Sequence, residues 1–192
     1  MDVVAIDPLA ELLAAPEGRF EWANGSLIEM SPPPTFEHGR GVLFLATLLD
    51  AYAEHHDLGV VVGDSFAQRL DETIRVPDVA FFKNASRDRI KETHSEGGAD
   101  LVVEIVSPDS GARDRGEKFE EYERAGIEEY WIVDPRRRIA EFYRLHNALY
   151  TPFGPDEEGR VYSSVLPGFY IRVGWLWERP KLNDAQRELG LI

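Results

Sequence analysis

The chain has 192 residues, a length that fits one domain able to bury a substantial core. It contains no cysteine, so disulfide bonds and thiolate-held zinc cannot contribute to its fold, and any metal must be held by oxygen or imidazole ligands. The 35 Asp and Glu residues outnumber the 21 Lys and Arg residues, and the net charge of −14 disfavours broad electrostatic attraction to nucleic acid. We therefore expect one domain over residues 1–192 and, where a metal is used, a hard cation.

Neither the apolar segments nor the first residues indicate membrane insertion or export. No apolar run is long enough to cross a bilayer, and the opening MDVVAIDPLAELLAA lacks a basic start, a long apolar stretch and a cleavage signature. A hydrophobic share of 43% is ordinary for a globular protein. These features predict a soluble, cytoplasmic protein with no membrane partner.

The first third of the chain predicts two helices separated by a hairpin. A helix is expected at about 9–15, and in FEWANGSLIEM the pair Asn24-Gly25 separates two short alternating runs, which is a strong hairpin signal. The loop SPPPT follows, and its Thr35 caps a predicted helix that reaches about His56. One face of this helix should pack on a sheet, and it is formed by His38, Val42, Leu45, Leu49 and Tyr52.

The middle of the chain predicts strands and one crossover. Three short strands are expected, at 60–62, 66–70 and 74–82. Asp71-Glu72 forms a turn between the last two, and Pro77 indicates an edge or a bulge.

After a polar stretch, LVVEIV is an apolar, β-branched run that predicts a strand buried on both faces, interrupted only by Glu104. A helix should follow, beginning at Asp109 or Ser110 and ending at Ala125, before YWIVD resumes as a buried strand. The segments IAEFYRL, ALYTPF and FYIRV then predict hairpins. We predict an α/β or α+β fold, with a mixed β-sheet core flanked by helices and carrying extra β-hairpins.

Two acidic residues are notable because their neighbours are almost all apolar. Asp78 lies in VPDVAFF, and Glu104 lies on a separate predicted strand. A buried carboxylate without a partner is costly, so such groups pair with a cation, bind a metal or face a cleft. On the following helix Asp114, Lys118 and Tyr122 recur every four residues, so they share one face, from which Lys118 can reach the carboxylates.

This set suits hydrolysis of a phosphodiester bond. Mg²⁺ keeps several waters and uses one or two carboxylates plus substrate phosphate, so Asp78 and Glu104 would be enough protein ligands. Mn²⁺ is a possible substitute. Lys118 would orient or polarise the attacking water. From spacing alone, the alternative is a buried salt bridge among the same three residues without catalysis.

Four segments resemble the Uma-two family of restriction endonuclease-like proteins: PDVAFF, DLVVEIVSPDS, the helix that carries Lys118, and GIEEYWIVDP. The likeness extends upstream to FEWANGSLIEMSPPPTFEH and downstream to VLPGFYIRV, so it covers nearly the whole chain. The family looks like a branch of the PD-(D/E)XK nuclease superfamily, whose sheet and flanking helices hold a metal-binding Asp, a metal-binding Glu and a Lys. The resemblance implies that Asp78 and Glu104 are the metal-binding acids of this chain.

The chain departs from the superfamily pattern at Val106, because the standard motif has Lys there, two residues after Glu104. Val cannot perform that role. The resemblance implies that the Lys function has moved to Lys118 on the next helix. If Lys118 points elsewhere, the domain would be a degenerate nuclease that serves as an interaction module.

Further candidates for catalytic roles match the family pattern at Glu21, Glu37 and His38. From the residues alone, a lone His on a helix face is more often structural, and an acid in the first turn complements the helix dipole. Tyr122 is able to bond an active-site carboxylate or to pack under the sheet, and Asp114 is placed to pair with the lysine of its own helix face.

Three functions fit these observations. The first is a magnesium-dependent endodeoxyribonuclease acting on DNA; the second is a nucleic-acid or protein interaction module, which Val106 and the acidic composition favour; the third is hydrolysis of another phosphate ester. The basic clusters at 87–91 and 136–138 would contact phosphates or simply lie on a solvated surface. A homodimer is expected, and the aromatic residues Trp175 and Trp177 either form its interface or close the core.

Overall fold

The computed structural model describes residues 6–15, 18–30, 35–63, 66–108 and 110–192. Most of the predicted loop SPPPT lies outside these residues. The helices, including two 3₁₀ helices (η), are α1 (Pro8–Leu13), α2 (Phe36–His55), η1 (Asn84–Arg89), α3 (Gly111–Arg115), α4 (Glu117–Arg124), η2 (Val173–Leu176) and α5 (Leu182–Glu188). The strands are β1 (Phe20–Ala23), β2 (Ser26–Glu29), β3 (Gly59–Gly63), β4 (Ala67–Leu70), β5 (Thr73–Arg75), β6 (Val79–Lys83), β7 (His94–Glu96), β8 (Leu101–Ile105), β9 (Glu129–Asp134), β10 (Ile139–His146), β11 (Leu149–Phe153), β12 (Arg160–Tyr162) and β13 (Tyr170–Arg172).

A six-stranded mixed sheet forms the centre of the fold, with strand order β11-β10-β9-β8-β6-β3. Strands β8 and β9 are parallel and are joined through α3 and α4, whereas the other neighbours are antiparallel. Parallel neighbours require a crossover connection, which the strand, helix, strand order in the sequence predicts. The predicted mixed sheet with flanking helices is therefore confirmed.

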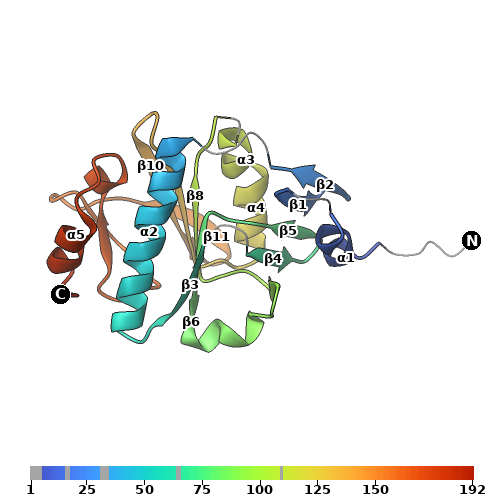
Figure 1. Cartoon of the computed structure of the whole chain (residues 1–192), viewed down its shortest axis with the longest axis horizontal. Helices are drawn as coiled ribbons and strands as arrows, with labels where there is room; N and C mark the ends of the chain where they lie inside the picture. The colour runs from blue at the N-terminus through green and yellow to red at the C-terminus, as the bar shows by residue number, and fades with distance from the viewer. Residues whose placement is uncertain (1–5, 16–17, 31–34, 64–65, 109) are drawn as a thin grey trace, which may run out of the picture.

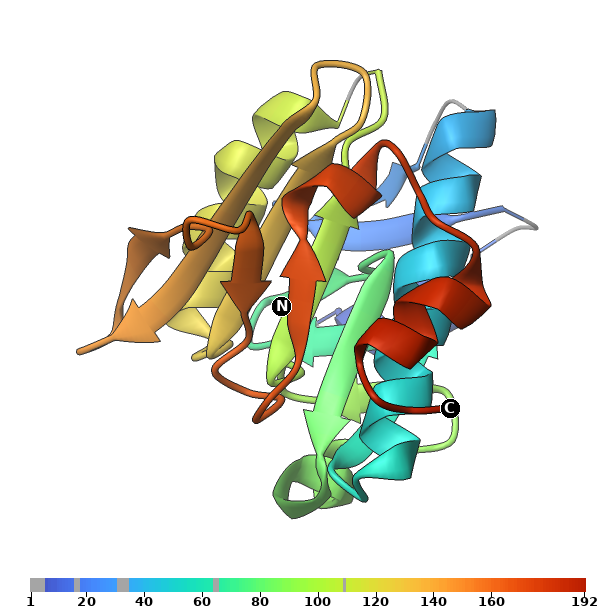
Figure 2. The ribbon, with the colours of Figure 1, turned by 90° about the vertical axis from the view of Figure 1, so that its left-hand side faces the viewer.

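Helices cover both faces of this sheet (Figures 1 and 2). On one face, α2 and α5 pack over a core that includes Val103 and Ile105 of β8. On the other face, α4 packs through Tyr122 over a core that includes Val102 of the same strand. Successive side chains of a strand point to opposite faces, so Glu104 faces α4, on the same side as Val102.

The long helix α2 begins as its sequence predicts. The Thr35 side chain accepts a hydrogen bond from the backbone N–H of His38 at 3.2 Å, which satisfies one of the unpaired donors at the helix start. Four of the five residues of the predicted apolar face are buried, and Val42 is partly buried against the same core.

A second sheet, with order β2-β1-β5-β4-β7, lies beside α4 (Figure 1). Its first hairpin turns at Asn24 and Gly25, which have φ values of 52° and 74°, as a tight two-residue turn requires. Strand β1 then pairs with β5, with Trp22 opposite Ile74. This pairing brings the N-terminal hairpin next to residues more than 50 positions later in the chain.

The predicted strand 74–82 is wrong as a single element. Strand β5 ends at Arg75 in the second sheet, and β6 begins at Val79 in the central sheet. Pro77 has no N–H to donate to a ladder, so the chain leaves one sheet and enters the other at this point. The residues 76–78 thus connect the two sheets.

The predicted helix up to Ala125 is also two helices. Gly116, with φ −116° and ψ −99°, separates α3 from α4, and Asp109 lies outside the described residues. In the polar stretch before β8, the structure contains η1 and the short strand β7, which the hydrophobic pattern did not reveal.

The two tryptophans near the C-terminal end belong to the core. Trp175 is 9% exposed and Trp177 is partly buried against the same cluster as α2, which agrees with the alternative that they close the core. Pairing of two copies stays a prediction. In the described part of the chain, every helix is too short or too polar to serve as a membrane span.

Candidate active site

The two predicted acidic residues meet at one edge of the central sheet. Asp78 immediately precedes β6, and Glu104 lies near the end of β8, which runs antiparallel to β6 with Val79 opposite Val103. One oxygen of Asp78, Oδ2, accepts the backbone N–H of Ile105 at 2.7 Å. Both acidic residues are only 4% exposed. The register of the two strands therefore places the Asp78 carboxylate against the backbone of β8, one residue after Glu104.

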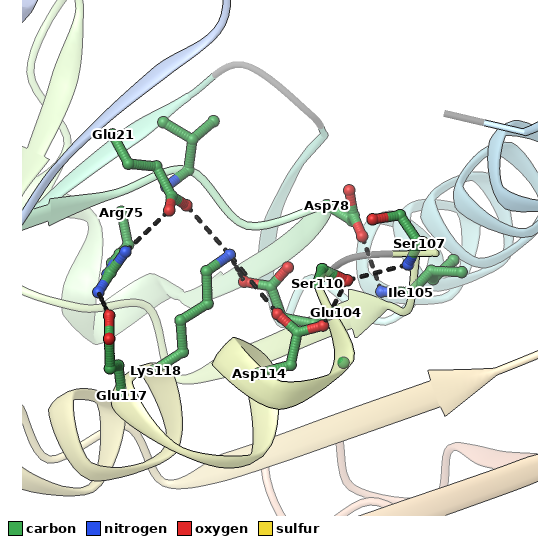
Figure 3. Close-up of polar contacts among 12 residues, drawn as sticks. Glu21, Arg75, Asp78, Glu104, Ile105, Ser107, Ser110, Asp114, Glu117 and Lys118 are labelled. Atoms are coloured by element: carbon green, nitrogen blue, oxygen red, sulfur yellow. Dashed lines mark hydrogen bonds and ion pairs between the residues drawn. The ribbon is translucent and has the colours of Figure 1, made fainter. Parts of the chain in front are cut away.

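Lys118 reaches Glu104 from helix α4 (Figure 3). Its Nζ lies 2.8 Å from Oε1 of Glu104, and the hydroxyl of Tyr122 donates to the same oxygen at 2.7 Å. No described residue donates a hydrogen bond to the other oxygen, Oε2. Glu104 therefore has one oxygen fixed by the protein and one that remains available to a ligand.

Val106, the residue directly after β8, lies on the same side of the central sheet as Glu104. It is 8% exposed and packs in the same apolar cluster as Tyr122 and Ile132. Side chains two positions apart on a strand share a face, so this is the position from which a lysine would reach Glu104. In this chain the lysine that contacts Glu104 comes instead from α4.

Glu21 joins the site from the second sheet. Its Oε1 lies 3.0 Å from Nζ of Lys118 and accepts the backbone N–H of Val76 at 3.1 Å, while its Oε2 accepts from Nη1 of Arg75 at 2.9 Å. Glu21 is fully buried. Lys118 therefore bridges a carboxylate from each sheet.

Arg75 is a member of the site that the sequence analysis missed. It is fully buried, and besides Glu21 it binds both oxygens of Glu121, at 2.5 and 2.8 Å, and approaches Glu117 at 3.5 Å. The available signal was a lone basic residue in the otherwise apolar run TIRVPDV. Its partners lie more than 40 residues away in the chain, so the sequence alone did not identify them.

Asp114 lies at the same site on α3. Its Oδ1 is 3.9 Å from Nζ of Lys118, and its Oδ2 accepts from the hydroxyl of Ser110 at 2.7 Å. The same hydroxyl accepts the backbone N–H of Ser107 at 2.9 Å, which links α3 to the end of β8. The helix face predicted for Asp114, Lys118 and Tyr122 is retained across the break at Gly116.

His38 and Glu37 have different positions although they are adjacent in sequence. Nε2 of His38 lies 3.2 Å from Oδ1 of Asp78, and the His38 side chain is buried. The Glu37 side chain is 55% exposed and pairs with Arg179. The structure therefore brings His38 to the site, and it contradicts the proposed role of Glu37 there.

The charges of the site shift several pKa values. Burial alone would lower the pKa of Lys118, but Glu104, Glu21 and Asp114 raise it well above its ordinary value, so the side chain stays an ammonium. Burial would raise the pKa of Glu21, but Lys118, Arg75 and the N–H of Val76 lower it overall. Glu21 is therefore a permanent carboxylate near neutral pH.

Glu104 behaves in the opposite way. Burial raises its pKa, and repulsion from Asp114, Asp78 and Glu21 adds to this effect, so that despite Lys118 the pKa of Glu104 is about 8. Burial likewise raises the pKa of Asp114, against the charge of Lys118. The site therefore has an excess of buried acidic groups over cations, and it retains protons near neutral pH.

This excess fits a hard divalent cation. The donors are carboxylate oxygens, which Mg²⁺ prefers, and a cation could take the place of the proton on Glu104. Among the described residues, no group of three or more His, Asp or Glu side chains is arranged to hold a metal ion.

The fold is a mixed α/β domain with a buried acidic centre where β6 begins and β8 ends. A family model named Uma2 and described as "Putative restriction endonuclease" matches residues 7–174. Because the match covers most of the chain, the protein belongs to this family. Its membership confirms the resemblance in PDVAFF, LVVEIV and the Lys118 helix.

A solved structure is also similar to this chain. It is described as a putative nuclease belonging to DUF820 from Anabaena variabilis ATCC 29413, with a TM-score of 0.76 and 18% sequence identity. The alignment covers 91% of this chain and 99% of that chain. At this identity the likeness shows that the two chains share a fold. No curated protein matches the sequence.

Proposed function

We propose that the protein is a metal-dependent endonuclease that hydrolyses phosphodiester bonds in DNA. The observation that carries this proposal is the position of Lys118, whose ammonium lies 2.8 Å from Glu104. Lys118 on α4 thus takes the place of the lysine that the superfamily motif has at the position of Val106. The family and the fold support a nuclease, and the charge excess of the site supports a divalent metal.

Asp78 and Glu104 would hold the metal. The backbone N–H of Ile105 and the imidazole of His38 orient Asp78, while Lys118 and Tyr122 hold one oxygen of Glu104 and leave the other for the ion. A bound Mg²⁺ or Mn²⁺ would supply a water of lowered pKa and neutralise charge on the phosphate oxygens. Two carboxylates are enough for such an ion.

Lys118 would act as a cation and not as a base. Its raised pKa keeps the proton on Nζ at neutral pH, so it cannot remove a proton from water. As an ammonium it orients the attacking water through a hydrogen bond and stabilises negative charge that develops on the phosphate. Glu21 would be a positioning residue, because it contacts Lys118 at 3.0 Å, and Arg75 would act through Glu21, to which it donates at 2.9 Å.

The same geometry supports a second candidate, a non-catalytic interaction module. Lys118 already contacts Glu104 and Glu21 at 2.8 and 3.0 Å, as it would in a purely structural buried ion pair. This candidate predicts a folded protein that binds its partner but cleaves nothing.

Nicking of supercoiled plasmid distinguishes the two candidates. Wild type, Asp78→Asn, Lys118→Met and Lys118→Arg are compared in Mg²⁺, Mn²⁺ and EDTA, and Glu37→Gln serves as a control carboxylate outside the site. We expect nicking by wild type and Glu37→Gln only with metal, and a loss of at least about 100-fold in Asp78→Asn and Lys118→Met.

Other outcomes would redistribute the roles. Nicking that survives in folded Lys118→Met but not in Asp78→Asn would retain the metal-binding pair and reject Lys118 as an active-site cation. Absence of nicking by wild type with either metal would favour the interaction module.

A further inference from the structure

A pocket of about 660 Å³ opens beside the acidic site, at the same edge of the central sheet. Val106 and Ser107, which follow directly after β8, line one side of it, and Arg115 of α3 lines another. The remaining wall contains Arg136 and Arg137. The pocket therefore begins two residues beyond Glu104.

The topology explains why arginines gather here. Strands β8 and β9 are parallel, with Ile105 opposite Val133, so both strands end at the same edge of the sheet. The turn from β9 to β10 follows Asp134 and carries three consecutive arginines. The basic cluster at 87–91 lies after β6, which begins at the acidic site and runs away from it.

The arginines of the pocket differ in how they are held. Arg115 is fixed by Glu141, with Nε and Nη2 both 2.6 Å from one carboxylate oxygen. The Arg137 side chain is 74% exposed and approaches Asp134 only to 3.8 Å. Arg136 is exposed and forms no ion pair with any described residue.

The pocket reverses the charge of the surrounding protein. Three guanidinium groups and one carboxylate, Asp134, line it, although the chain carries a net charge of −14. Asp134 is 4% exposed and accepts the backbone N–H of Arg137 at 3.0 Å, so it also holds the turn that presents the arginines. A local positive surface beside an acidic catalytic centre is what an anionic polymer needs in order to approach.

We propose that this pocket binds a backbone phosphate of the DNA strand, next to the phosphodiester that lies over Asp78 and Glu104. The proposal rests on the endonuclease function proposed above. Guanidinium groups present planar pairs of donors that match phosphate oxygens, and contacts of this kind position a strand without reading its sequence. Arg115 is the fixed wall of this site, and Arg136 and Arg137 are the exposed donors.

The test measures binding separately from cleavage. A fluorescently labelled DNA duplex of about two helical turns is titrated in Ca²⁺ and in EDTA at several salt concentrations, with Arg136→Gln, Arg137→Gln and the double variant. The matched control is Arg187→Gln, because Arg187 is also exposed and also pairs with an aspartate three residues earlier, Asp184.

We expect each pocket variant to weaken binding by about fivefold to tenfold and to lower the slope of log K against log salt by roughly one. The double variant should lose more than either single variant, and Arg187→Gln should bind as wild type does. In cleavage assays KM should rise in the pocket variants, while kcat at saturating DNA should be retained.

The outcomes separate this inference from the proposed function. Wild type that binds the duplex through Arg136 and Arg137 but cleaves nothing would support the pocket and reject the nuclease. Cleavage by wild type with unchanged binding and KM in both pocket variants would reject the pocket and support the nuclease. Wild type that does not bind the duplex at all would overturn the pocket proposal.

Discussion

The carboxylate of Glu104 and the ammonium of Lys118 are 2.8 Å apart, and both side chains are almost completely buried. Glu104 lies on β8 in the central sheet, and Lys118 lies on α4, which packs on the face of the sheet that Glu104 points to. An ion pair in such surroundings is strongly affected by the loss of either partner, because the remaining charge has no access to water.

Lys118→Met should therefore destabilise the protein by about 3–5 kcal/mol, the usual cost of removing one partner from a buried ion pair. It leaves the buried acids Glu21, Glu104 and Asp114 without their shared cation. Urea denaturation followed by tryptophan fluorescence measures the change. Adding Glu21→Gln to Lys118→Met should recover part of the loss, because Glu21 is the buried acid that stays charged near neutral pH. A double variant no more stable than Lys118→Met would contradict this account.

The stability of the metal-free protein should fall as the pH rises from about 4.5 to about 8. The pKa of Glu104 is raised from 4.5 to about 8, so in this window the folded protein retains a proton that the unfolded chain releases. The stabilisation is complete below pH 4.5 and is lost as the pH passes through 8, with a limiting slope of about 1.4 kcal/mol per pH unit for one proton. Denaturation in EDTA at several pH values measures it.

Glu104→Gln is the corresponding test variant, because it removes the titrating group and retains the shape of the side chain. The decline between pH 4.5 and 8 should become shallower in this variant, and Glu37→Gln should behave as wild type does. An unchanged decline in Glu104→Gln would assign the pH dependence to other groups, of which Asp114, with its raised pKa, is the first to examine.

Mg²⁺ should stabilise the folded protein in the absence of DNA. A ligand that binds only the folded state at ten times its Kd contributes about 1.4 kcal/mol. The rise in Tm should be larger at pH 8.5 than at pH 6, because at the lower pH the ion competes with the proton on Glu104. Thermal denaturation with increasing Mg²⁺ measures the shift, and an equal shift in wild type and Asp78→Asn would place the ion elsewhere.

The two glycines of β3 should respond differently to alanine. A Cβ at Gly59 would lie 2.0 Å from the carbonyl oxygen of Phe82 in the neighbouring strand, whereas a Cβ at Gly63 would meet nothing within 4 Å. Gly59→Ala should cost about 2 kcal/mol or more because backbone must move, and Gly63→Ala should change stability by no more than about 0.5 kcal/mol. Equal midpoints in urea for the two variants would contradict the close packing of β3 on β6.

The sequence predicted those parts of the site that depend on local pattern. Asp78 and Glu104 are recognisable because acids interrupt apolar strands, and Lys118 follows from four-residue spacing on a helix. The family resemblance assigned roles to them. Glu21 was also predicted only through that resemblance, since nothing in its hairpin indicates a contact with a helix nearly 100 residues later.

The features that the sequence analysis missed depend on how the two sheets meet. Pro77 was correctly identified as an interruption, but the pattern does not say that the chain changes sheet there. Arg75 could not be assigned for the same reason, because its partners Glu21 and Glu121 come together only when β1 pairs with β5 and α4 packs beside them. Glu37 and His38 were both predicted as candidates for the site. The orientation of α2 points His38 toward Asp78 and leaves Glu37 exposed.

The connection at residues 76–78 also makes the complete site depend on both sheets. The N–H of Val76 bonds to Glu21 in one sheet, while Asp78 bonds to Ile105 in the other, so one short segment is anchored on both sides. A chain that has formed only the central sheet would have Asp78 and Glu104 in place. It would lack Glu21, which lies in the second sheet and contacts Lys118. Completion of the site therefore coincides with the docking of the two sheets, so partly folded chains would lack the complete acidic centre.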